Sequence, residues 1–353
     1  MLFNPSDFDL LTVKNIIQET SRAKTIVLQK ADDTVYNILP GQFITLVFED
    51  KNAPLGFITR SYSISKVAGK EFSITVKELE NGWVSRRLNT ALEVDHILYS
   101  SGVGGVFTLP TDYNNYPQIA FFAAGSGITP IFNIITHLLN SEFNGKIWLV
   151  YSNSTPSQAI FKNELELLVQ SYPDNFKIEW LFSDSGTILK ARLSNFLLWD
   201  FMKDYVIVPH HELLAYICGP IEYMDMVRIT LLGEGVKKEN IKQEIFDTYI
   251  EEELLSEPDD KGTHKVKILN NTAPPIEFEV TYPDSILDAA LKNEIKLPFS
   301  CRSGQCGTCV TKCISGEVFI SYNEVLTPLD IKNGFVLTCQ GHPINGDVVI
   351  KYN

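Results

Sequence analysis

A chain of 353 residues is longer than one ordinary domain and suggests two or three domains. Its content of 44% hydrophobic and 21% charged residues is typical of globular protein. The net charge of −13 argues against nucleic acid as a partner, because its phosphates would repel the protein. No run of 18 apolar residues occurs, and the first residues lack the basic and apolar regions of a secretory signal, so we expect a cytoplasmic protein without a membrane span.

The first 112 residues have the pattern of short strands. Apolar and polar side chains alternate at 11–17, 24–29, 42–49 and 71–79, with turns between these segments. Regularly spaced short strands predict a small antiparallel barrel.

From Gln118 onward, strand patterns alternate with helical patterns. Strands are predicted at 118–124, 146–152, 177–183 and 213–219, and helices at 131–139, 163–172 and 224–235. This alternation predicts βαβ units around a parallel sheet, over residues 113–249.

An acidic stretch then separates a third unit. Residues 250–263 hold six acidic residues against one lysine and are expected to form a linker. Residues 264–353 follow, beginning with a predicted hairpin at 264–283. The next segment predicts a helix that opens with a capping box formed by Ser285 and Asp288.

Five of the six cysteines lie within the last 53 residues, and such clustering is more typical of metal binding than of disulfides. Cys301, Cys306 and Cys309 have the spacing C-x4-C-x2-C, and Cys339 follows after 29 intervening residues. This is the plant-type 2Fe–2S arrangement, in which four thiolates hold two irons. We therefore predict a cluster held by these four cysteines, with Cys313 as a thiol on the following strand.

The loop between the first three cysteines has to curl around the cluster. Gly304 and Gly307, with Ser303 and Thr308, supply a backbone that turns freely and amides that reach the sulfides. Residues 316–343 resemble the ferredoxin stretch that returns the fourth cysteine. The alternative is a zinc site, which usually takes two C-x2-C pairs, whereas this chain has one.

Residues 60–65 read RSYSIS, and residues 81–88 read NGWVSRRL. At this separation the pair resembles the flavin-binding elements of the ferredoxin–NADP reductase family, although RSYSIS alone also fits an alternating strand with an exposed arginine. The resemblance implies that Tyr62 stacks on the flavin ring, Ser63 hydrogen-bonds near its reactive nitrogen, and Arg60 neutralises its phosphate. A flat aromatic ring and a guanidinium fork suit these roles.

The same resemblance implies a wider cofactor-binding set. Gly82 permits close backbone approach, and Val84 and Ser85 present donors to the phosphates. The order of the units favours FAD over FMN by family analogy. The implied flavin contacts are Arg60, Tyr62, Ser63, Ile64, Ser65, Val76, Gly82, Trp83, Val84 and Ser85.

Residues 121–130, FFAAGSGITP, follow a predicted strand and open a predicted helix. Pro130 stands where the G-x-G-x-x-G fingerprint has its third glycine, so the segment resembles instead the G-x-G-x-x-P motif of the same reductase family. Such a turn comes close to a pyrophosphate, whose charge the helix N-terminus favours. A bare strand–turn–helix is the alternative. The implied nucleotide contacts are Gly125, Ser126, Gly127, Ile128, Thr129 and Pro130.

The sequence ICGP includes Cys218, Gly219 and Pro220, and it resembles the family element beside the nicotinamide. The resemblance implies that these three residues contact the nucleotide, and that Cys218 joins Tyr62 and Ser63 as a catalytic candidate. A buried structural cysteine at a strand end is the competing interpretation.

The choice of coenzyme depends on the segment that contains Ser152, Asn153 and Ser154, which are candidate nucleotide contacts. NADPH-preferring relatives often carry an arginine where Ser154 stands, and a guanidinium is a natural partner of the 2′-phosphate. Arg192 is a possible substitute. NADH and NADPH both stay open, with a slight lean to NADPH.

The motifs occur in the order barrel (1–112), nucleotide domain (113–249), linker (250–263) and ferredoxin domain (264–353). This order resembles the reductase family of oxygenase systems such as the phenylacetyl-CoA epoxidase. It implies a six-stranded antiparallel barrel, an α/β domain and a β-grasp-like ferredoxin. It also implies electron flow from NAD(P)H through FAD and 2Fe–2S to a partner protein, an oxygenase or hydroxylase. A self-sufficient diaphorase or stress-related reductase, and a sensor with vestigial sites, are alternatives. We expect a monomer.

Overall fold

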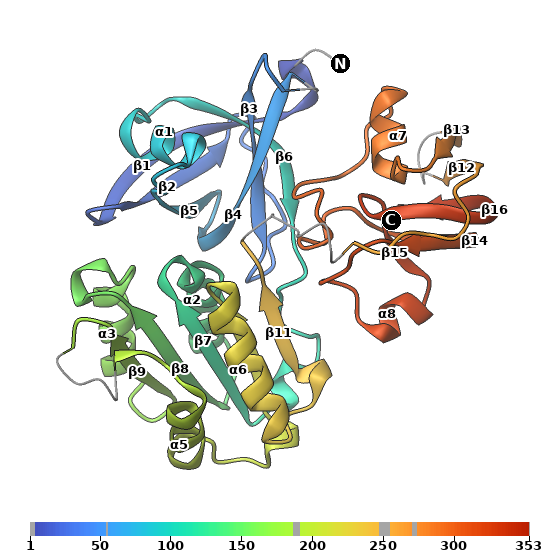
Figure 1. Ribbon diagram of the computed structural model, residues 1–353. Coiled ribbons are helices and arrows are strands. Elements are labelled where there is room, and N and C mark those ends of the chain that lie inside the picture. Colours follow the sequence, from blue (N-terminus) through green and yellow to red (C-terminus); the bar gives the residue numbers. More distant parts are fainter. Residues whose placement is uncertain (1–3, 54–55, 186–190, 247–254, 270–273, 353) are drawn as a thin grey trace.

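The computed structural model describes residues 4–53, 56–185, 191–246, 255–269 and 274–352. Its described strands form a closed six-stranded barrel and two separate five-stranded sheets. Figure 1 shows the barrel next to the α/β unit, with the C-terminal unit beside them. The predicted multidomain fold of barrel, α/β domain and β-grasp-like ferredoxin is confirmed.

The barrel has the strand order β1-β2-β5-β4-β3-β6. Its elements are β1 (Asp9–Thr20), β2 (Ala23–Lys30), β3 (Phe43–Glu49), β4 (Phe57–Ala68), β5 (Glu71–Lys77), α1 (Trp83–Thr90) and β6 (Ile97–Gly104). Ile44 and Leu46 of β3 fill the core, and Ile44 lies opposite Tyr62 of β4. Because side chains alternate between the two faces of a strand, Ser61 and Ser63 face outward from the barrel.

The α/β unit is a parallel sheet of order β11-β10-β7-β8-β9. Its strands are β7 (Gln118–Ala124), β8 (Lys146–Asn153), β9 (Phe176–Phe182), β10 (Leu214–Cys218) and β11 (Ile241–Glu244). Its helices are α2 (Ile128–Asn140), α3 (Lys162–Ser171), α5 (Asn195–Tyr205) and α6 (Ile221–Gly233). Helices α2 and α3 contribute to one core, and α5 and α6 to the other.

The C-terminal unit is a mixed sheet of order β13-β12-β16-β14-β15. Its elements are β12 (Thr263–Leu269), β13 (Ile276–Thr281), α7 (Ile286–Lys292), β14 (Val310–Ile320), α8 (Pro328–Lys332), β15 (Phe335–Leu337) and β16 (Gly341–Lys351). The predicted hairpin is the antiparallel pair β12–β13, whereas β12 and β16 are parallel. The predicted capping box is present at the start of α7.

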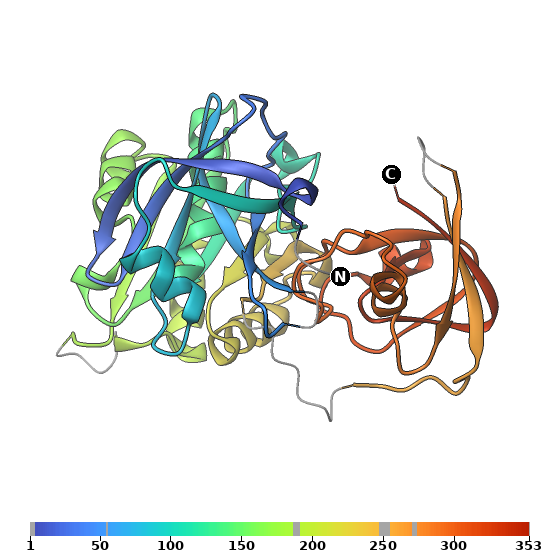
Figure 2. The same cartoon turned by 90° about the horizontal axis from the view of Figure 1, so that it is seen from above.

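The C-terminal unit contacts the barrel directly (Figure 2). Lys296 pairs with Asp7, and Thr59 Oγ1 donates a hydrogen bond to Ser300 O at 3.2 Å. Residues 247–254, which include the start of the predicted linker, lie outside the described residues. The domain boundaries therefore stay predictions.

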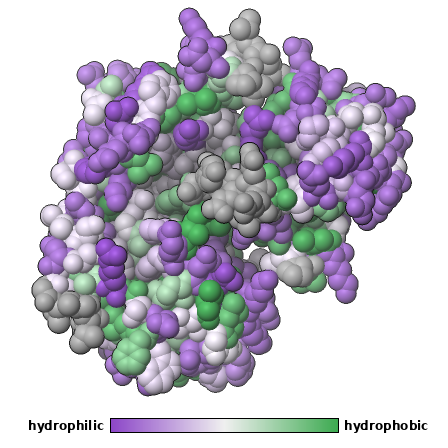
Figure 3. All heavy atoms as spheres, in the orientation of Figure 1, coloured by the Kyte–Doolittle hydropathy of each residue, from purple (hydrophilic) through white to green (hydrophobic). Residues whose placement is uncertain are grey.

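The face in Figure 3 is hydrophilic along the outer rim of the units, and hydrophobic side chains show near their junction. Among the described helices, none combines the length and hydrophobicity needed to cross a membrane.

Candidate functional site

The four predicted ligand cysteines lie in the C-terminal unit as two pairs. Cys309 Sγ and Cys339 Sγ are 3.2 Å apart, and the Cys301 amide lies 3.5 Å from Cys306 Sγ. Within the described residues no group of three His, Cys, Asp or Glu side chains is placed to hold one metal ion, and the four cysteines are arranged two by two. Two pairs of thiols fit two irons. Cys313 lies apart on β14, where its thiol faces a carbonyl of the same strand at 3.4 Å.

The backbone shape of the ligand loop prepares it for a cluster. Gly304 has a φ of 70°, and a side chain there would meet Tyr322 O at 2.6 Å, so glycine is required. The Ser303 amide lies 3.4 Å from Cys301 Sγ. A hydrogen bond from the Cys306 thiol lowers the pKa of Cys301, and the same bond raises the pKa of Cys306, so the two thiols titrate as a pair.

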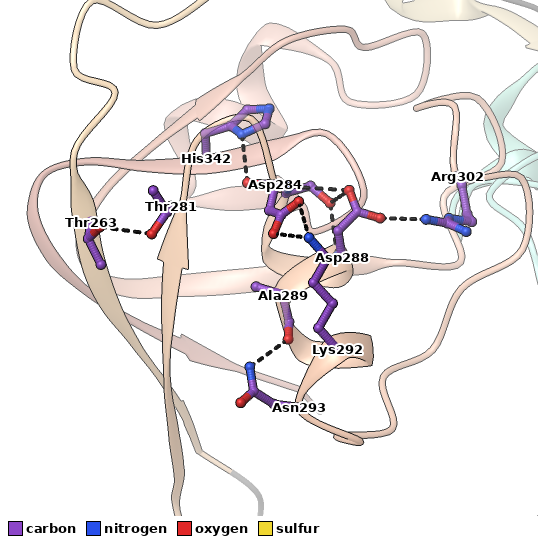
Figure 4. Close-up of polar contacts among 10 residues, drawn as sticks. Thr263, Thr281, Asp284, Asp288, Ala289, Lys292, Asn293, Arg302 and His342 are labelled. Atoms are coloured by element: carbon purple, nitrogen blue, oxygen red, sulfur yellow. Dashed lines mark hydrogen bonds and ion pairs between the residues drawn. The ribbon is translucent and has the colours of Figure 1, made fainter. Parts of the chain in front are cut away.

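Arg302 follows the first ligand and has a φ of 58°, a strained conformation for a residue with a side chain. Its guanidinium pairs with Asp288 of α7 (Figure 4). Its carbonyl accepts from Gln340 Nε2 at 3.0 Å. Asp288 Oδ2 also closes the capping box, accepting from Ser285 N and Oγ at 3.2 and 2.7 Å. Asp288 therefore ties the start of α7 to the ligand loop.

Asp288→Ala is expected to shorten the lifetime of the cluster on heating. It removes a helix cap, worth about 1 kcal/mol, and it frees the strained Arg302. Asp330→Ala is the matched control, because Asp330 closes an equivalent box with Thr327 of α8 and makes no ion pair among the described residues. Cluster absorbance should bleach faster in Asp288→Ala than in the control. Equal rates would contradict a role of Asp288 in joining α7 to the ligand loop.

Three side chains from two units meet beside the predicted flavin motif. Ser63 Oγ on β4 donates to Glu244 Oε2 at 2.9 Å, and Glu244 on β11 lies opposite Cys218 on β10. All three are buried, and Cys218 has no exposed surface. Burial raises the pKa of Cys218, and it raises the pKa of Glu244 to about 8. A carboxyl group thus links two of the predicted catalytic residues.

Arg60 and Tyr62 lie on the same strand. The exposed Arg60 donates from Nη1 to Thr59 O at 2.7 Å, and its other donors have no partner among the described residues. Burial raises the pKa of Tyr62, so its hydroxyl is neutral. A free guanidinium near a neutral aromatic ring fits the phosphate and ring of a flavin.

The second flavin element forms the start of α1. Gly82 is the N-cap, and the first-turn amides of Trp83 and Val84 have no partner within the helix. Ser85 Oγ donates to Gly82 O and accepts from Leu79 N, both at 3.1 Å, so this hydroxyl fixes the turn. The amides at the helix start are therefore the available donors for a phosphate.

Three other predicted cofactor residues lie inside the barrel wall. Ile64, Ser65 and Val76 are at most 1% exposed, and Ser65 Oγ donates to Ser73 O at 3.2 Å. Their side chains are buried in the barrel. A contact with the cofactor, made through their backbone atoms, stays a prediction.

The nucleotide turn packs on the end of β10. Gly125–Gly127 form a short turn before α2, and Thr129 Oγ1 donates to Ser126 O at 2.9 Å. A side chain at Gly127 would meet Cys218 O at 2.1 Å, so the close packing of the two turns requires glycine there. The turn is thereby fixed at the carboxyl edge of the sheet, where open α/β sheets bind ligands.

The other predicted contacts of this motif line the same edge. Ile128 and Pro130 are buried in the first turn of α2. Pro220 is the N-cap of α6, and Gly219 passes so close to Ala124 that an added Cβ would lie 2.9 Å from the Ala124 Cβ.

Unpartnered polar atoms mark the ends of β8 and β9. Ser152 Oγ, Asn153 Nδ2 and Ser185 Oγ are buried and have no hydrogen bond of acceptable geometry within the described residues. The Tyr223 hydroxyl lies near Ser152 without satisfying it. Buried polar groups are normally paired, so these three atoms fit a polar ligand such as a nucleotide. Ser154 is exposed beside them.

Arg192 is exposed, and no described contact joins it to Ser152, Asn153 or Ser154. Ser152, Asn153 and Ser154 thus lie at the end of β8, and no described contact places Arg192 beside them.

Comparisons with known proteins match two units. Residues 121–229 match the oxidoreductase NAD-binding domain, and residues 269–343 match the 2Fe-2S iron-sulfur cluster binding domain. The ferredoxin reductase component of the 3-ketosteroid-9-alpha-monooxygenase of Mycolicibacterium smegmatis is 30% identical over 337 residues, covering 89% of this chain and 88% of that protein. One component of the 1,2-phenylacetyl-CoA epoxidase of Escherichia coli is 31% identical over 339 residues, covering 90% of this chain and 89% of that protein. The chain belongs to this ferredoxin reductase family.

This reductase also shares its fold with a solved relative. The phthalate dioxygenase reductase structure superposes with a TM-score of 0.60 at 20% identity, covering 99% of this chain and 100% of that one. The resemblance stated from the motifs is confirmed, and the chain is an oxidoreductase with an NAD-binding and a 2Fe–2S domain.

Two residues of the reductase site were not predicted from sequence. Glu244 ends a short polar strand, and only the sheet order places it beside Cys218. Lys77 ends β5, and its Nζ lies 3.4 Å from the position of a Cβ on Gly125. Burial lowers the pKa of Lys77, so its charge gains from a nearby phosphate. A lysine just before the second flavin element was a usable signal for this role.

Glu244→Gln is expected to flatten the pH dependence of unfolding. The folded pKa of about 8 lies above the usual 4.5, so the stabilising contribution of the protonated form is full below about pH 4.5 and is lost as pH rises through 8. The wild-type free energy of unfolding should fall by up to about 1.4 kcal/mol per pH unit in that window. Urea unfolding at pH 5 to 9 measures this, and parallel curves for both proteins would contradict it.

Proposed function

We propose that this reductase takes electrons from NAD(P)H, passes them through FAD and the 2Fe–2S cluster, and delivers them to an oxygenase or hydroxylase partner. The contacts of β4 carry the proposal. At one point Ser63 donates to Glu244 of the nucleotide unit at 2.9 Å. Four residues earlier Thr59 donates to the carbonyl beside Cys301 at 3.2 Å. One strand, which bears the flavin motif, thus touches both neighbouring redox units.

The residues of the chain bind and orient the redox groups. The turn at Gly125–Gly127 and the Lys77 ammonium suit a pyrophosphate, and the paired thiols suit two irons. Ser63 and Glu244 hold a hydrogen bond at the junction of the flavin and nicotinamide sites. A bound flavin supplies the change from two-electron to one-electron chemistry, while the protein supplies orientation and electrostatics. The mass of the flavin released by acid distinguishes FAD from FMN.

The names of the relatives support an oxygenase partner. One relative is named for a ketosteroid monooxygenase and another for a phenylacetyl-CoA epoxidase, two systems with unrelated substrates. The substrate therefore belongs to the partner, and we propose that this chain, as a monomer, is a general electron donor to such a component.

An electron-acceptor screen tests the proposal. With NADH or NADPH, the whole chain should reduce ferricyanide, cytochrome c and an oxygenase component of the source organism. A chain lacking residues 250–353 should reduce ferricyanide alone. Equal loss of both small-acceptor activities on this deletion would count against the proposed route. Turnover with cytochrome c but with no oxygenase component would favour the self-sufficient diaphorase.

Arg192→Ala tests the lean toward NADPH. If the guanidinium pairs with the 2′-phosphate, KM for NADPH should rise by roughly 10-fold, as expected for one charged hydrogen bond. KM for NADH should stay within about twofold, because NADH has no such phosphate. An equal change for both coenzymes would remove Arg192 from the site.

A further inference from the structure

We propose that Ser300 is a positioning residue that sets the docking of the cluster loop on the flavin strand, at a hydroxyl junction made of Thr45, Thr59, Ser61 and Ser300. The inference rests on the proposed function, since it concerns the step between flavin and cluster. It assigns that step to one face of the barrel and to one side of the cluster.

Hydrogen bonds connect the junction without a gap. Ser61 Oγ is bonded to Ser300 Oγ and lies 3.0 Å from Thr45 Oγ1. Thr59 Oγ1 donates to Ser300 O at 3.2 Å. Ser300 is only 8% exposed, although it lies between two units. Ser61 is exposed, so the buried side of this contact is the side of Ser300 and Thr45.

The junction adjoins both redox sites along the chain. Ser61 lies between Arg60 and Tyr62, the predicted flavin contacts, and Ser300 directly precedes the ligand Cys301. Because Tyr62 faces the barrel interior and Ser61 faces outward, the flavin motif presents its aromatic ring and its junction hydroxyl on opposite sides of one strand.

A second contact orients the same side of the cluster. Thr308 Oγ1 accepts from Cys306 Sγ at 3.4 Å and lies 3.2 Å from the position of a Cβ on Gly104 of β6. The backbone at Gly307 lies against Val106, because a Cβ added to Gly307 would be 3.0 Å from Val106 Cγ1.

The other two ligands lie deeper in the C-terminal unit. Cys309 and Cys339 are 2% and 6% exposed and belong to its hydrophobic core. The pair of Cys301 and Cys306 therefore faces the barrel, and electrons from the flavin half enter the cluster on that side.

The hydroxyl junction itself is small and polar. An ion pair between Lys296 and Asp7 also joins the C-terminal unit to the N-terminal part of the chain. Polar interfaces between domains of one chain dock and separate readily. Removing one hydrogen bond from such an interface should therefore change the docked population measurably.

The test uses the whole cluster-loaded chain in anaerobic stopped flow with NADPH or NADH. In Ser300→Ala and in Ser61→Ala, cluster reduction should slow by about 10-fold, the effect of one lost hydrogen bond on docking. Ferricyanide reduction should stay within about twofold, because the flavin and nucleotide sites are untouched. The double variant should be no slower than either single one, since both remove the same bond.

Three controls separate positioning from damage. Ser61→Thr keeps the hydroxyl and should restore the wild-type rate. Ser315→Ala changes an exposed serine of β14 and should have no effect. The midpoint potential and the EPR spectrum of the cluster should be those of the wild type in every variant.

Normal cluster reduction in Ser300→Ala and Ser61→Ala would overturn the junction and leave the proposed function intact. A changed cluster potential or EPR spectrum would also overturn it, because Ser300 would then act on the cluster itself. A wild-type chain whose cluster is not reduced by either coenzyme would instead refute the proposed function.

Discussion

Replacing Cys339 by serine is expected to abolish cytochrome c reduction while ferricyanide reduction continues. Cys339 is 6% exposed and its Sγ lies 3.2 Å from Cys309 Sγ, so the variant loses half of one thiol pair. Cluster binding stabilises the fold around it, so the C-terminal unit should also unfold at a lower temperature. Iron and acid-labile sulfide analysis, visible absorbance and the two acceptor assays measure these effects.

Cys313→Ser is the matched control for this experiment. Cys313 belongs to the same unit, but its thiol faces a carbonyl of β14 and lies outside both pairs. This variant should keep its cluster and both activities. A cluster that survives Cys339→Ser, or that disappears in Cys313→Ser, would mean that the ligand set is wrong.

Replacing Ser63 by alanine is expected to slow flavin reduction by NAD(P)H by roughly 100- to 1000-fold, the usual cost of deleting one preorganised hydrogen-bond donor. Ser63 Oγ donates its one hydrogen to Glu244 Oε2, so the variant breaks the pair that fixes both groups beside the predicted flavin site. The loss should fall on the rate of flavin reduction rather than on the affinity for the coenzyme. Single-turnover stopped flow at the flavin absorbance separates the two quantities.

Ser65→Ala provides the comparison on the same strand. Ser65 is as buried as Ser63, but its hydroxyl bonds to Ser73 O of the neighbouring strand β5. It should cost stability, about 1 kcal/mol for a buried hydrogen bond, and leave the rate of flavin reduction within a few-fold. If the two variants slow reduction equally, the role of Ser63 is structural.

Local patterns were sufficient to predict the units and the cluster. Ligands that lie close together in sequence have a diagnostic spacing, as Cys301, Cys306 and Cys309 do, and alternation is a local property of each strand. The capping box of Ser285 and Asp288 also spans a single helical turn, and the structure contains it.

Contacts between distant segments were not predictable in this way. Ser63 and Glu244 are 181 positions apart, and Ser61 and Ser300 are 239 apart. Each contact depends on how two whole units pack against each other, and a short stretch of sequence contains no information about that packing. The turn contact of Ser85, whose hydroxyl donates to Gly82 O, was likewise not predicted, and its contact with a phosphate stays a prediction.

Anaerobic reduction of the whole chain by NADPH and by NADH, followed at low temperature by EPR, tests whether electrons pass from the nucleotide through the flavin to the cluster. We expect bleaching of the flavin together with the signal of a reduced 2Fe–2S cluster with at least one coenzyme. Flavin bleaching with no cluster signal, in protein whose cluster dithionite does reduce, would contradict a route from nucleotide through flavin to Cys301–Cys339.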